Sequence, residues 1–171
     1  MLPANIARTL DEAAARWPDQ PALYMPPVRG PLRRERYSML TFSELGQLAG
    51  DIASGLKSIG VARGQRVAIM VPPSIEFFAL TFALFRIGAV PVLIDPGMGR
   101  KNLAQCFREA RPEVFIGVPK AHIARSLLGW AKDSIKQFVT VGRRLWWPGR
   151  TFDELRHLGQ RAGATPIEHP E

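Results

Sequence analysis

The chain has 171 residues, of which 46% are hydrophobic and 22% charged, proportions that exclude collagen-like, coiled-coil and disordered chains. This length suits one domain with a sizeable core rather than two complete domains. The 23 Lys and Arg against 15 Asp and Glu give a net charge of +8, which favours anionic partners without choosing among nucleic acid, phosphate-bearing ligands and membrane surfaces. The single Cys106 excludes an internal disulfide and a cysteine-based zinc site, and fits a reducing compartment.

The beginning of the chain lacks the features of a secretory signal, because Pro3 and Asn5 interrupt any apolar core there. The most apolar segment, 77–93, is interrupted by Arg86, and its unbroken part is shorter than the roughly 18 residues that a spanning helix needs. We therefore expect no transmembrane segment and a cytoplasmic protein.

The first third of the chain predicts two helices separated by a loop. Apolar residues recur every three or four positions over 5–17, which predicts an amphipathic helix that Pro18 ends. Residues 25–36 are rich in proline, glycine and arginine and predict an exposed loop. Residues 41–44, Thr-Phe-Ser-Glu, form a capping box, so a second helix is expected to begin there and to end at Gly60.

Beyond this helix, short apolar runs alternate with helical stretches. Strands are predicted at 66–71, 90–95, 113–117 and 137–141, and helices at 74–86, 101–110 and 122–132. The runs lack polar alternation, which is typical of parallel strands covered on both faces. The sequence therefore predicts an α/β fold with an open, doubly wound, mainly parallel sheet, built from βαβ units over about 41–141. The tail, about 142–171, predicts one short helix after a second capping box at Thr151, and then an extended end.

In doubly wound sheets ligands bind beyond the carboxyl ends of the strands, here the loops 72–73, 95–100 and 118–120. The middle loop resembles G-x-G-x-x-G with asparagine in the third glycine position, and its amides and basic side chains suit a phosphate. Without the third glycine, and without an acidic residue after the next strand to hold a ribose, a plain turn and helix cap is favoured. The weak phosphate-site candidates are Gly97, Gly99, Arg100 and Lys101.

Other catalytic and metal-binding patterns are absent from the sequence. It contains no G-x-x-x-x-G-K-[ST], G-x-S-x-G or H-E-x-x-H motif. His122, His157 and His169 lack metal-ligand spacing, which favours surface or helix positions over a metal site. Cys106 falls in the middle of a predicted helix with no histidine nearby, which favours a buried, unreactive thiol. The residues alone therefore assign no catalytic residue and no metal ligand.

Two basic stretches, 33–36 and 143–150, invite comparison with nucleic-acid-binding surfaces. The second contains Trp146 and Trp147, which suit base stacking. Tryptophans beside a proline such as Pro148 more often pack a loop onto the core, and that interpretation is favoured.

A series of motifs covers roughly residues 6–141. They are Leu-Thr-Phe-Ser-Glu-Leu at 40–45, Gly-Val-Ala-Arg-Gly at 60–64 before Arg-Val-Ala-Ile-Met at 66–70, Glu76, and Arg-Ile-Gly-Ala-Val-Pro-Val-Leu-Ile-Asp-Pro at 86–96. Together they resemble the beginning of the AMP-forming adenylating enzymes, a superfamily that includes acyl-CoA synthetases, luciferases and the adenylation domains of peptide synthetases. Gln65 departs from the aspartate that many members have in this turn, a local change.

Further segments are similar to the bacterial fatty acyl-CoA ligase-like branch, which includes β-lactone synthetases of long-chain olefin biosynthesis. They are Val-Leu-Ile-Asp-Pro-Gly at 92–97, Glu-Val-Phe-Ile-Gly-Val-Pro at 113–119 and Val-Thr-Val-Gly-Arg-Arg at 139–144. The resemblance implies a two-step reaction, in which a carboxylate attacks the α-phosphate of ATP and a second nucleophile then displaces AMP. That nucleophile is the CoA thiol in a ligase and the substrate's own β-hydroxyl in a β-lactone synthetase. Magnesium is expected with the ATP, and a fatty acid, ATP and CoA are the implied partners of a full-length parent.

The chain lacks the phosphate loop, the Tyr-Gly-x-Thr-Glu segment, the ribose-binding aspartate and the catalytic lysine of that superfamily. We therefore expect residues 1–171 to be the N-terminal part of a large adenylation domain: a scaffold that is inactive and binds no cofactor without the remainder of the enzyme. Its uncovered apolar surface predicts self-association. Two alternatives remain open: a basic binding module for nucleic acid or an acidic partner, with nucleic acid the less favoured, and a nucleotide-phosphate binder at 97–101.

Overall fold

The computed structural model describes residues 5–26 and 37–168, apart from the side chains of Pro96 and Arg100. The helices are α1 (Ile6–Arg16), α2 (Phe42–Ser58), α3 (Ile75–Arg86), α4 (Arg100–Ala110), α5 (Pro119–Leu128) and α6 (Phe152–Ala162), with a short 3₁₀ turn, η1, at Pro96–Met98. The strands are β1 (Pro21–Met25), β2 (Ser38–Thr41), β3 (Arg66–Met70), β4 (Val90–Leu93), β5 (Val114–Gly117), β6 (Gln137–Thr140) and β7 (Arg150–Thr151). Within the described ranges no helix is both long enough and apolar enough to cross a bilayer.

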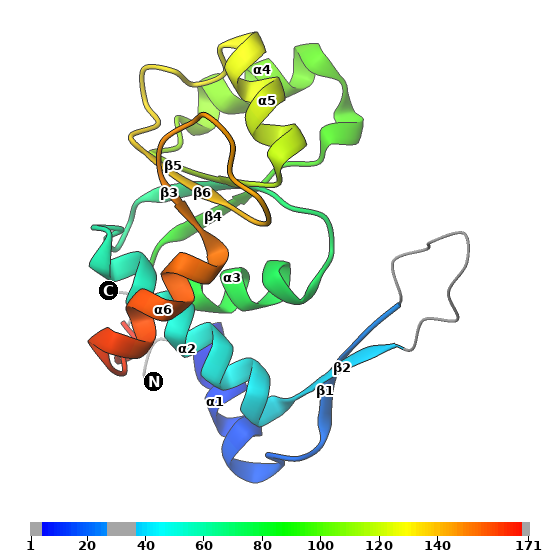
Figure 1. The fold of residues 1–171 in the computed structure, drawn as a ribbon, viewed down its shortest axis with the longest axis vertical. Helices are drawn as coiled ribbons and strands as arrows, with labels where there is room; N and C mark the ends of the chain where they lie inside the picture. Colours follow the sequence, from blue (N-terminus) through cyan, green and yellow to red (C-terminus); the bar gives the residue numbers. More distant parts are fainter. Residues whose placement is uncertain (1–4, 27–36, 169–171) are drawn as a thin grey trace.

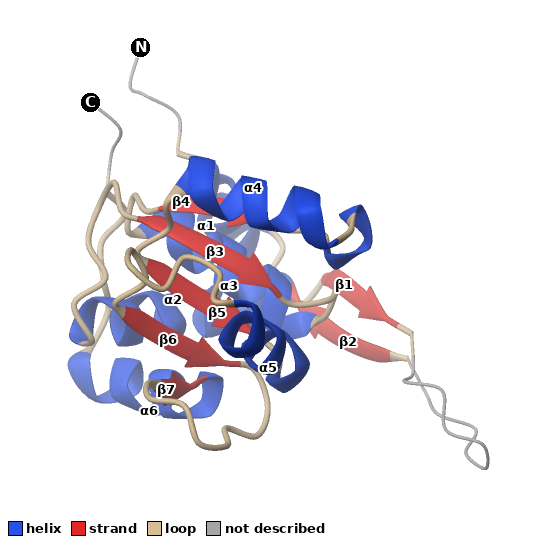
Figure 2. Cartoon of the chain, turned by 90° about the horizontal axis from the view of Figure 1, so that it is seen from above, coloured by secondary structure: helices blue, strands red, loops and turns tan. Residues whose placement is uncertain are grey.

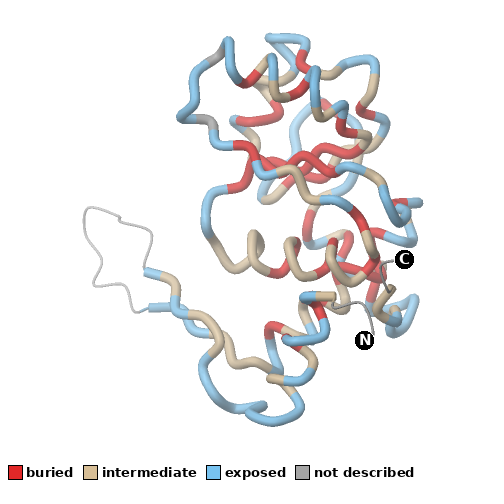
Figure 3. The backbone as a smooth tube through the Cα atoms, turned by 180° about the vertical axis from the view of Figure 1, so that it is seen from behind, coloured by how far each residue is buried: buried red, intermediate tan, exposed pale blue. Residues whose placement is uncertain are grey.

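A parallel five-stranded sheet in the order β4-β3-β5-β6-β7 separates two helical layers. Helices α2, α3 and α6 lie on one face and α4 and α5 on the other, as Figures 1 and 2 show. In β3, Val67 and Ile69 pack with the first layer, while Ala68 and Met70 pack with the second. All four side chains are buried, and the strands form a buried centre in Figure 3. Burial on both faces explains why the strand sequences show no polar alternation, and the predicted α/β fold is confirmed.

The loop predicted at 25–36 adjoins two strands, and its first residue, Met25, belongs to the first of them. Pro21–Met25 pairs antiparallel with Ser38–Thr41, a hairpin that the sequence analysis did not predict. Residues 27–36, including the basic stretch 33–36, lie outside the described residues. The strands were missed because neither carries a regular alternation of burial.

The predicted helices are present with shifted ends. The helix predicted at 122–132 begins earlier, at Pro119, and ends earlier, at Leu128. Proline suits the first helical position because it has no backbone N–H to leave unpaired. Gly129 ends the helix with a φ of 63°, in the left-handed region that favours glycine. The β4 strand ends two residues before its predicted limit, because the chain turns into η1 after Asp95.

Residues 150–162 of the tail pack against the rest of the fold as a strand and a helix. Both bonds of the capping box at Thr151 are present, as predicted, and Thr151 together with Arg150 forms the edge strand β7. Helix α6 packs closely on α2, where a Cβ atom on Gly55 would overlap the carbonyl oxygen of Leu155. A Cβ atom on Gly159 would likewise overlap the carbonyl oxygen of Asp51. Only glycine allows the two backbones to approach this closely.

Residues 163–168 belong to no helix or strand and are fixed to the rest of the fold by hydrogen bonds. The Ser54 hydroxyl donates to the Gly163 carbonyl at 2.7 Å. The Glu168 amide donates to the Arg86 carbonyl at 2.8 Å, and its carboxylate pairs with Lys57 at 2.6 Å. Asn5 also donates to the Glu168 carbonyl at 2.8 Å, so the two ends of the described chain lie side by side (Figure 1).

Candidate functional site

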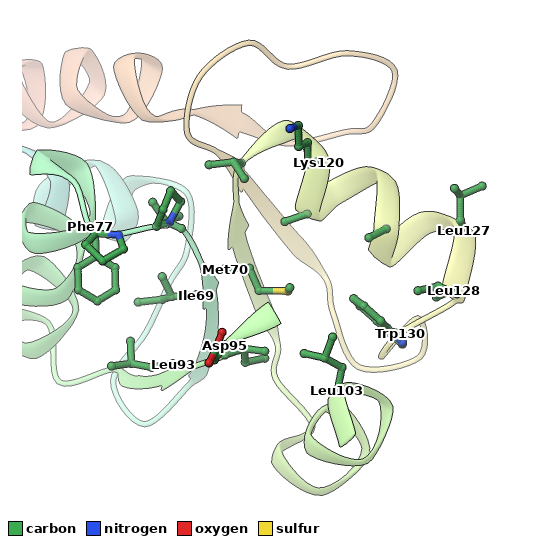
Figure 4. Close-up of a pocket in the computed structure, with 17 residues that line it drawn as sticks. Ile69, Met70, Phe77, Leu93, Asp95, Leu103, Lys120, Leu127, Leu128 and Trp130 are labelled. Carbon is green, nitrogen blue, oxygen red and sulfur yellow. The ribbon is translucent and has the colours of Figure 1, made fainter. Parts of the chain in front are cut away.

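A cavity of about 1100 Å³ opens at the carboxyl ends of β3, β4 and β5, between α4 and α5 (Figure 4). Its lining is mostly apolar and comprises Ile69, Met70, Val71, Pro72, Pro73, Phe77, Leu93, Ile94, Asp95, Leu103, Val118, Lys120, Ala121, Ala124, Leu127, Leu128 and Trp130. All three loops that the sequence analysis selected contribute to this lining. The cavity therefore lies at the edge of the sheet where the sequence analysis placed its search for a site.

The inner wall of the cavity is a fixed part of the core. Met70, Leu103 and Trp130 are buried and belong to the cluster between the sheet and helices α4 and α5. Phe107 stacks on Trp130 with a centroid distance of 5.4 Å and an interplanar angle of 18°. Aromatic stacking of this kind holds the indole in place. The wall therefore offers a preformed apolar surface.

The mouth of the cavity exposes further apolar side chains. Leu93 at the end of β4 is 59% exposed, and Leu127 on α5 is 80% exposed. Figure 4 shows Leu93 and Leu127 at opposite sides of the opening. Sequence analysis missed the helix-borne lining residues, because their apolar spacing is the same as that of any core-facing helix.

Two charged residues line the rim, and they have different roles. The Asp95 carboxylate accepts a hydrogen bond from the Gly97 amide at 2.8 Å and caps η1. Lys120 is exposed in the first turn of α5 and forms no hydrogen bond or ion pair with any other described residue. Helices α4 and α5 both begin at this edge without a side-chain cap, so their positive ends are not neutralised locally. The arrangement suits an apolar group in the cavity and an anionic group at its rim.

The phosphate-site candidates lie beside this rim. Gly97 is in η1, where its amide is already bonded to Asp95. Gly99 precedes α4 with a φ of 84°, which explains the glycine without a ligand. Lys101 is exposed in the first turn of α4, and the side chain of Arg100 is outside the described part of the structure. A phosphate site at 97–101 stays a prediction, and Gly99 is accounted for by backbone geometry.

His122 lies on a helix, one of the two positions expected for the histidines, and not at the surface. Its side chain is fully buried on α5, where Nε2 lies 3.0 Å from the Val139 carbonyl oxygen. The imidazole stacks on the Trp147 indole at a centroid distance of 4.9 Å, nearly parallel at 5°. Helix α5 begins at Pro119, so His122 lies in its first turns, and its ring contacts strand β6. His157 is exposed on α6, and His169 lies outside the described residues.

The pKa of His122 is lowered to about 4, mainly by burial and to a lesser extent by the positive charge of Arg125, against the opposing effect of the Val139 carbonyl. The neutral imidazole is therefore the form present near neutral pH. Its Nε2 contacts the Val139 carbonyl oxygen at 3.0 Å and the Thr140 hydroxyl at 3.3 Å, and these contacts join α5 to β6. Groups of three or more potential metal ligands do not occur in the described ranges.

Cys106 is half-buried rather than buried, and its Sγ lies 3.6 Å from the sulfur of Met98. The expected packing of the tryptophan pair holds for one member only. Trp147 is 4% exposed, and its Nε1 donates to the Thr140 hydroxyl at 2.9 Å. Trp146 is 69% exposed, because the indole that follows it in the chain occupies the site beside His122.

The fold occurs in a known class of proteins. Residues 10–161 match the AMP-binding enzyme family, and the chain belongs to that family. The resemblance to AMP-forming adenylating enzymes is thereby confirmed.

Three relatives define the likeness more closely. The chain is 48% identical over 163 residues to an olefin β-lactone synthetase of Stenotrophomonas maltophilia and 47% identical over 161 residues to one of Xanthomonas campestris. Both alignments cover 94% of this chain and 29% of the relative, so the chain spans less than a third of their length. A long-chain-fatty-acid-CoA ligase of Archaeoglobus fulgidus has the same fold, with a TM-score of 0.82 at 21% identity over 100% of this chain and 33% of its own.

Proposed function

We propose that this chain is the N-terminal scaffold portion of an ATP-dependent, AMP-forming enzyme that activates a long-chain carboxylic acid. The observation that supports the proposal is the identity of 48% and 47%, over 94% of the chain, to two proteins named olefin β-lactone synthetase. In this proposal residues 1–171 form part of a large adenylation domain. The remainder of the parent supplies the groups that carry the reaction.

The reaction has two steps. The carboxylate attacks the α-phosphate of ATP, forming an acyl-adenylate and releasing pyrophosphate. In the second step a β-hydroxyl of the same substrate attacks the acyl carbon, loses its proton and releases AMP, which closes a β-lactone. Magnesium, when bound with ATP, neutralises phosphate charge. The described residues offer no group of three or more metal ligands, so we assign the ion to no side chain of this chain.

A long-chain acyl-CoA ligase is the second candidate. Its support is the shared fold with the Archaeoglobus fulgidus ligase, at an identity of 21%. In that case the CoA thiol is the second nucleophile. The sequence identities of 48% and 47% to the β-lactone synthetases favour the substrate's own β-hydroxyl as the second nucleophile. A stand-alone nucleic-acid module gains no support from the family match.

The edge cavity contributes to the proposal through its chemistry. Its apolar walls and the cationic Lys120 at the rim suit an aliphatic chain that carries an anionic end. In the parent enzyme, Leu127→Asp is expected to raise KM for a long-chain acid and to leave KM for ATP unchanged. Ile6→Asp, at a 54% exposed position on α1, is the matched control. An unchanged KM in the Leu127 variant would place the aliphatic chain elsewhere while leaving the adenylation proposal intact.

The decisive assay is ATP–pyrophosphate exchange with a long-chain β-hydroxy acid. The parent enzyme is expected to catalyse exchange, and the 171-residue chain alone is expected not to. Product analysis with CoA present then distinguishes a β-lactone from an acyl-CoA, and the acid of equal length without the hydroxyl is the control. Absence of exchange by the parent would contradict adenylation, and exchange by the chain alone would contradict the scaffold role.

A further inference from the structure

The segment between β6 and β7, residues 142–149, is a loop held firmly at its base. Trp147 is buried against His122, and its Nε1 donates to Thr140. Gly149 has a φ of 110° and approaches the Phe138 carbonyl so closely that a Cβ atom would overlap the carbonyl oxygen. The Arg144 guanidinium donates to the Gly149 carbonyl at 2.6 Å and closes the loop. The residues between these anchors are therefore presented in a fixed arrangement.

This loop presents two apolar side chains to solvent. Leu145 is 43% exposed and Trp146 is 69% exposed, and they are consecutive. Trp146 meets Trp147 edge to face at 5.2 Å, so its position depends on the buried anchor. Isolated exposed apolar residues are common, but a rigid pair at the end of an anchored loop places a continuous apolar surface where a partner can reach it.

Three arginines flank this pair: Arg143, Arg144 and Arg150. No acidic residue occurs from Gly142 to Thr151 in the sequence. Among the described residues, none of the three arginines forms an ion pair with a carboxylate. Their charge is not neutralised within the fold and adds locally to the net charge of +8. The loop combines an apolar tip with a surrounding positive charge.

We propose that this loop docks the protein on an anionic phospholipid surface, an interaction independent of the proposed catalytic function. Tryptophan is enriched at the depth of the lipid headgroups, where its ring lies in the apolar boundary and its N–H in the polar one. Leu145 extends the apolar surface beside it, and the arginines bind lipid phosphates. The aliphatic Leu145 favours lipid over single-stranded nucleic acid, which binds by stacking on aromatic rings.

Co-sedimentation with vesicles tests the proposal on the 171-residue chain itself. We expect binding to vesicles of equimolar phosphatidylcholine and phosphatidylglycerol, much weaker binding to phosphatidylcholine alone, and a decline of binding with added salt. Arg143→Gln combined with Arg150→Gln is expected to lower the partition coefficient about 30-fold, at about fivefold for each arginine near an anionic surface. The matched control, Lys132→Gln with Lys136→Gln, removes the same charge elsewhere and is expected to bind nearly as the wild type does.

Trp146→Ser tests the apolar contribution, with Ile6→Ser as the control at an exposed aliphatic residue outside both the loop and the edge cavity. The loop variant is expected to lose at least tenfold in binding, since an interfacial aromatic anchor contributes buried apolar area. Circular dichroism of each variant verifies the fold. Equal vesicle binding by the loop variants and the controls would overturn the proposal. Equal binding to vesicles with and without phosphatidylglycerol would overturn it as well. Binding of a single-stranded oligonucleotide through the same arginines, with no binding to vesicles, would also overturn it.

Discussion

The buried His122 makes the stability of this fold depend on pH in a defined interval. The pKa of its imidazole is lowered from 6.5 to about 4 by burial. Between these values the unfolded chain binds a proton at His122 that the folded chain does not bind. The free energy of unfolding is therefore expected to fall as the pH falls from 6.5 to about 4, and to keep the full contribution above 6.5.

The magnitude follows from the two pKa values. At 1.36 kcal/mol per pKa unit, the interval from 6.5 to about 4 corresponds to about 3 kcal/mol, of which about 2 kcal/mol is already lost at pH 5. This is a large part of the stability of an ordinary domain, about 5–15 kcal/mol. Acidification to pH 5 is therefore expected to destabilise the chain measurably without unfolding it.

Urea denaturation at pH 7 and pH 5, on the wild type and on His122→Gln, measures this contribution. Glutamine keeps a side-chain donor near the Val139 carbonyl but does not titrate. Between pH 7 and pH 5, the free energy of unfolding of His122→Gln is therefore expected to fall by about 2 kcal/mol less than that of the wild type. His157→Gln, on the exposed side of α6, is the control and is expected to follow the wild type. Parallel losses in the wild type and His122→Gln would refute the reasoning. NMR titration of the His122 ring in the wild type gives an independent answer if the variant does not fold.

Two further predictions concern contacts that fix the tail and the 142–149 loop. Gly55→Ala and Gly159→Ala each insert a methyl group into the α2–α6 contact. Each variant is expected to lower the free energy of unfolding by about 1–3 kcal/mol. Gly50→Ala, where no atom lies within 4 Å of the added Cβ, is expected to be neutral or stabilising, and an equal loss in all three variants would contradict this account. Thr140→Val removes the acceptor of the buried Trp147 indole N–H and is expected to cost about 1–3 kcal/mol in urea denaturation, whereas the exposed Thr9→Val should change stability by less than about 0.5 kcal/mol. A Thr140 variant as stable as the wild type would show that the bond does not anchor the loop.

The resemblance of the chain to adenylating enzymes could be predicted from sequence because the motifs are continuous segments of strand, turn and helix start. The sequence did not predict which charged residues lie together at the rim of the cavity. Asp95 follows strand β4 and Lys120 follows strand β5, in the first turn of α5, and both line one cavity because the parallel sheet places both strand ends at the same edge. The general location was therefore predictable, whereas the volume of the cavity and the helix residues that line it were not.

The sequence by itself determined the features that depend on near neighbours in the chain. Both capping boxes, at Thr41 and Thr151, formed as predicted, because their hydrogen bonds join residues three apart. The strands of the parallel sheet were likewise predictable, since burial on both faces requires continuous apolar runs.

Only the tertiary structure decided the features that join distant segments. The environment of His122 depends on Val139, 17 residues away, and on an indole from the following loop. The choice of which tryptophan is buried and which is exposed was made by the space beside His122, which no local pattern records. The close α2–α6 packing likewise requires two glycines more than a hundred residues apart in the chain, Gly55 and Gly159, to lie at one contact. Such contacts depend on the complementary shapes of packed elements, and these exist only once the chain has folded.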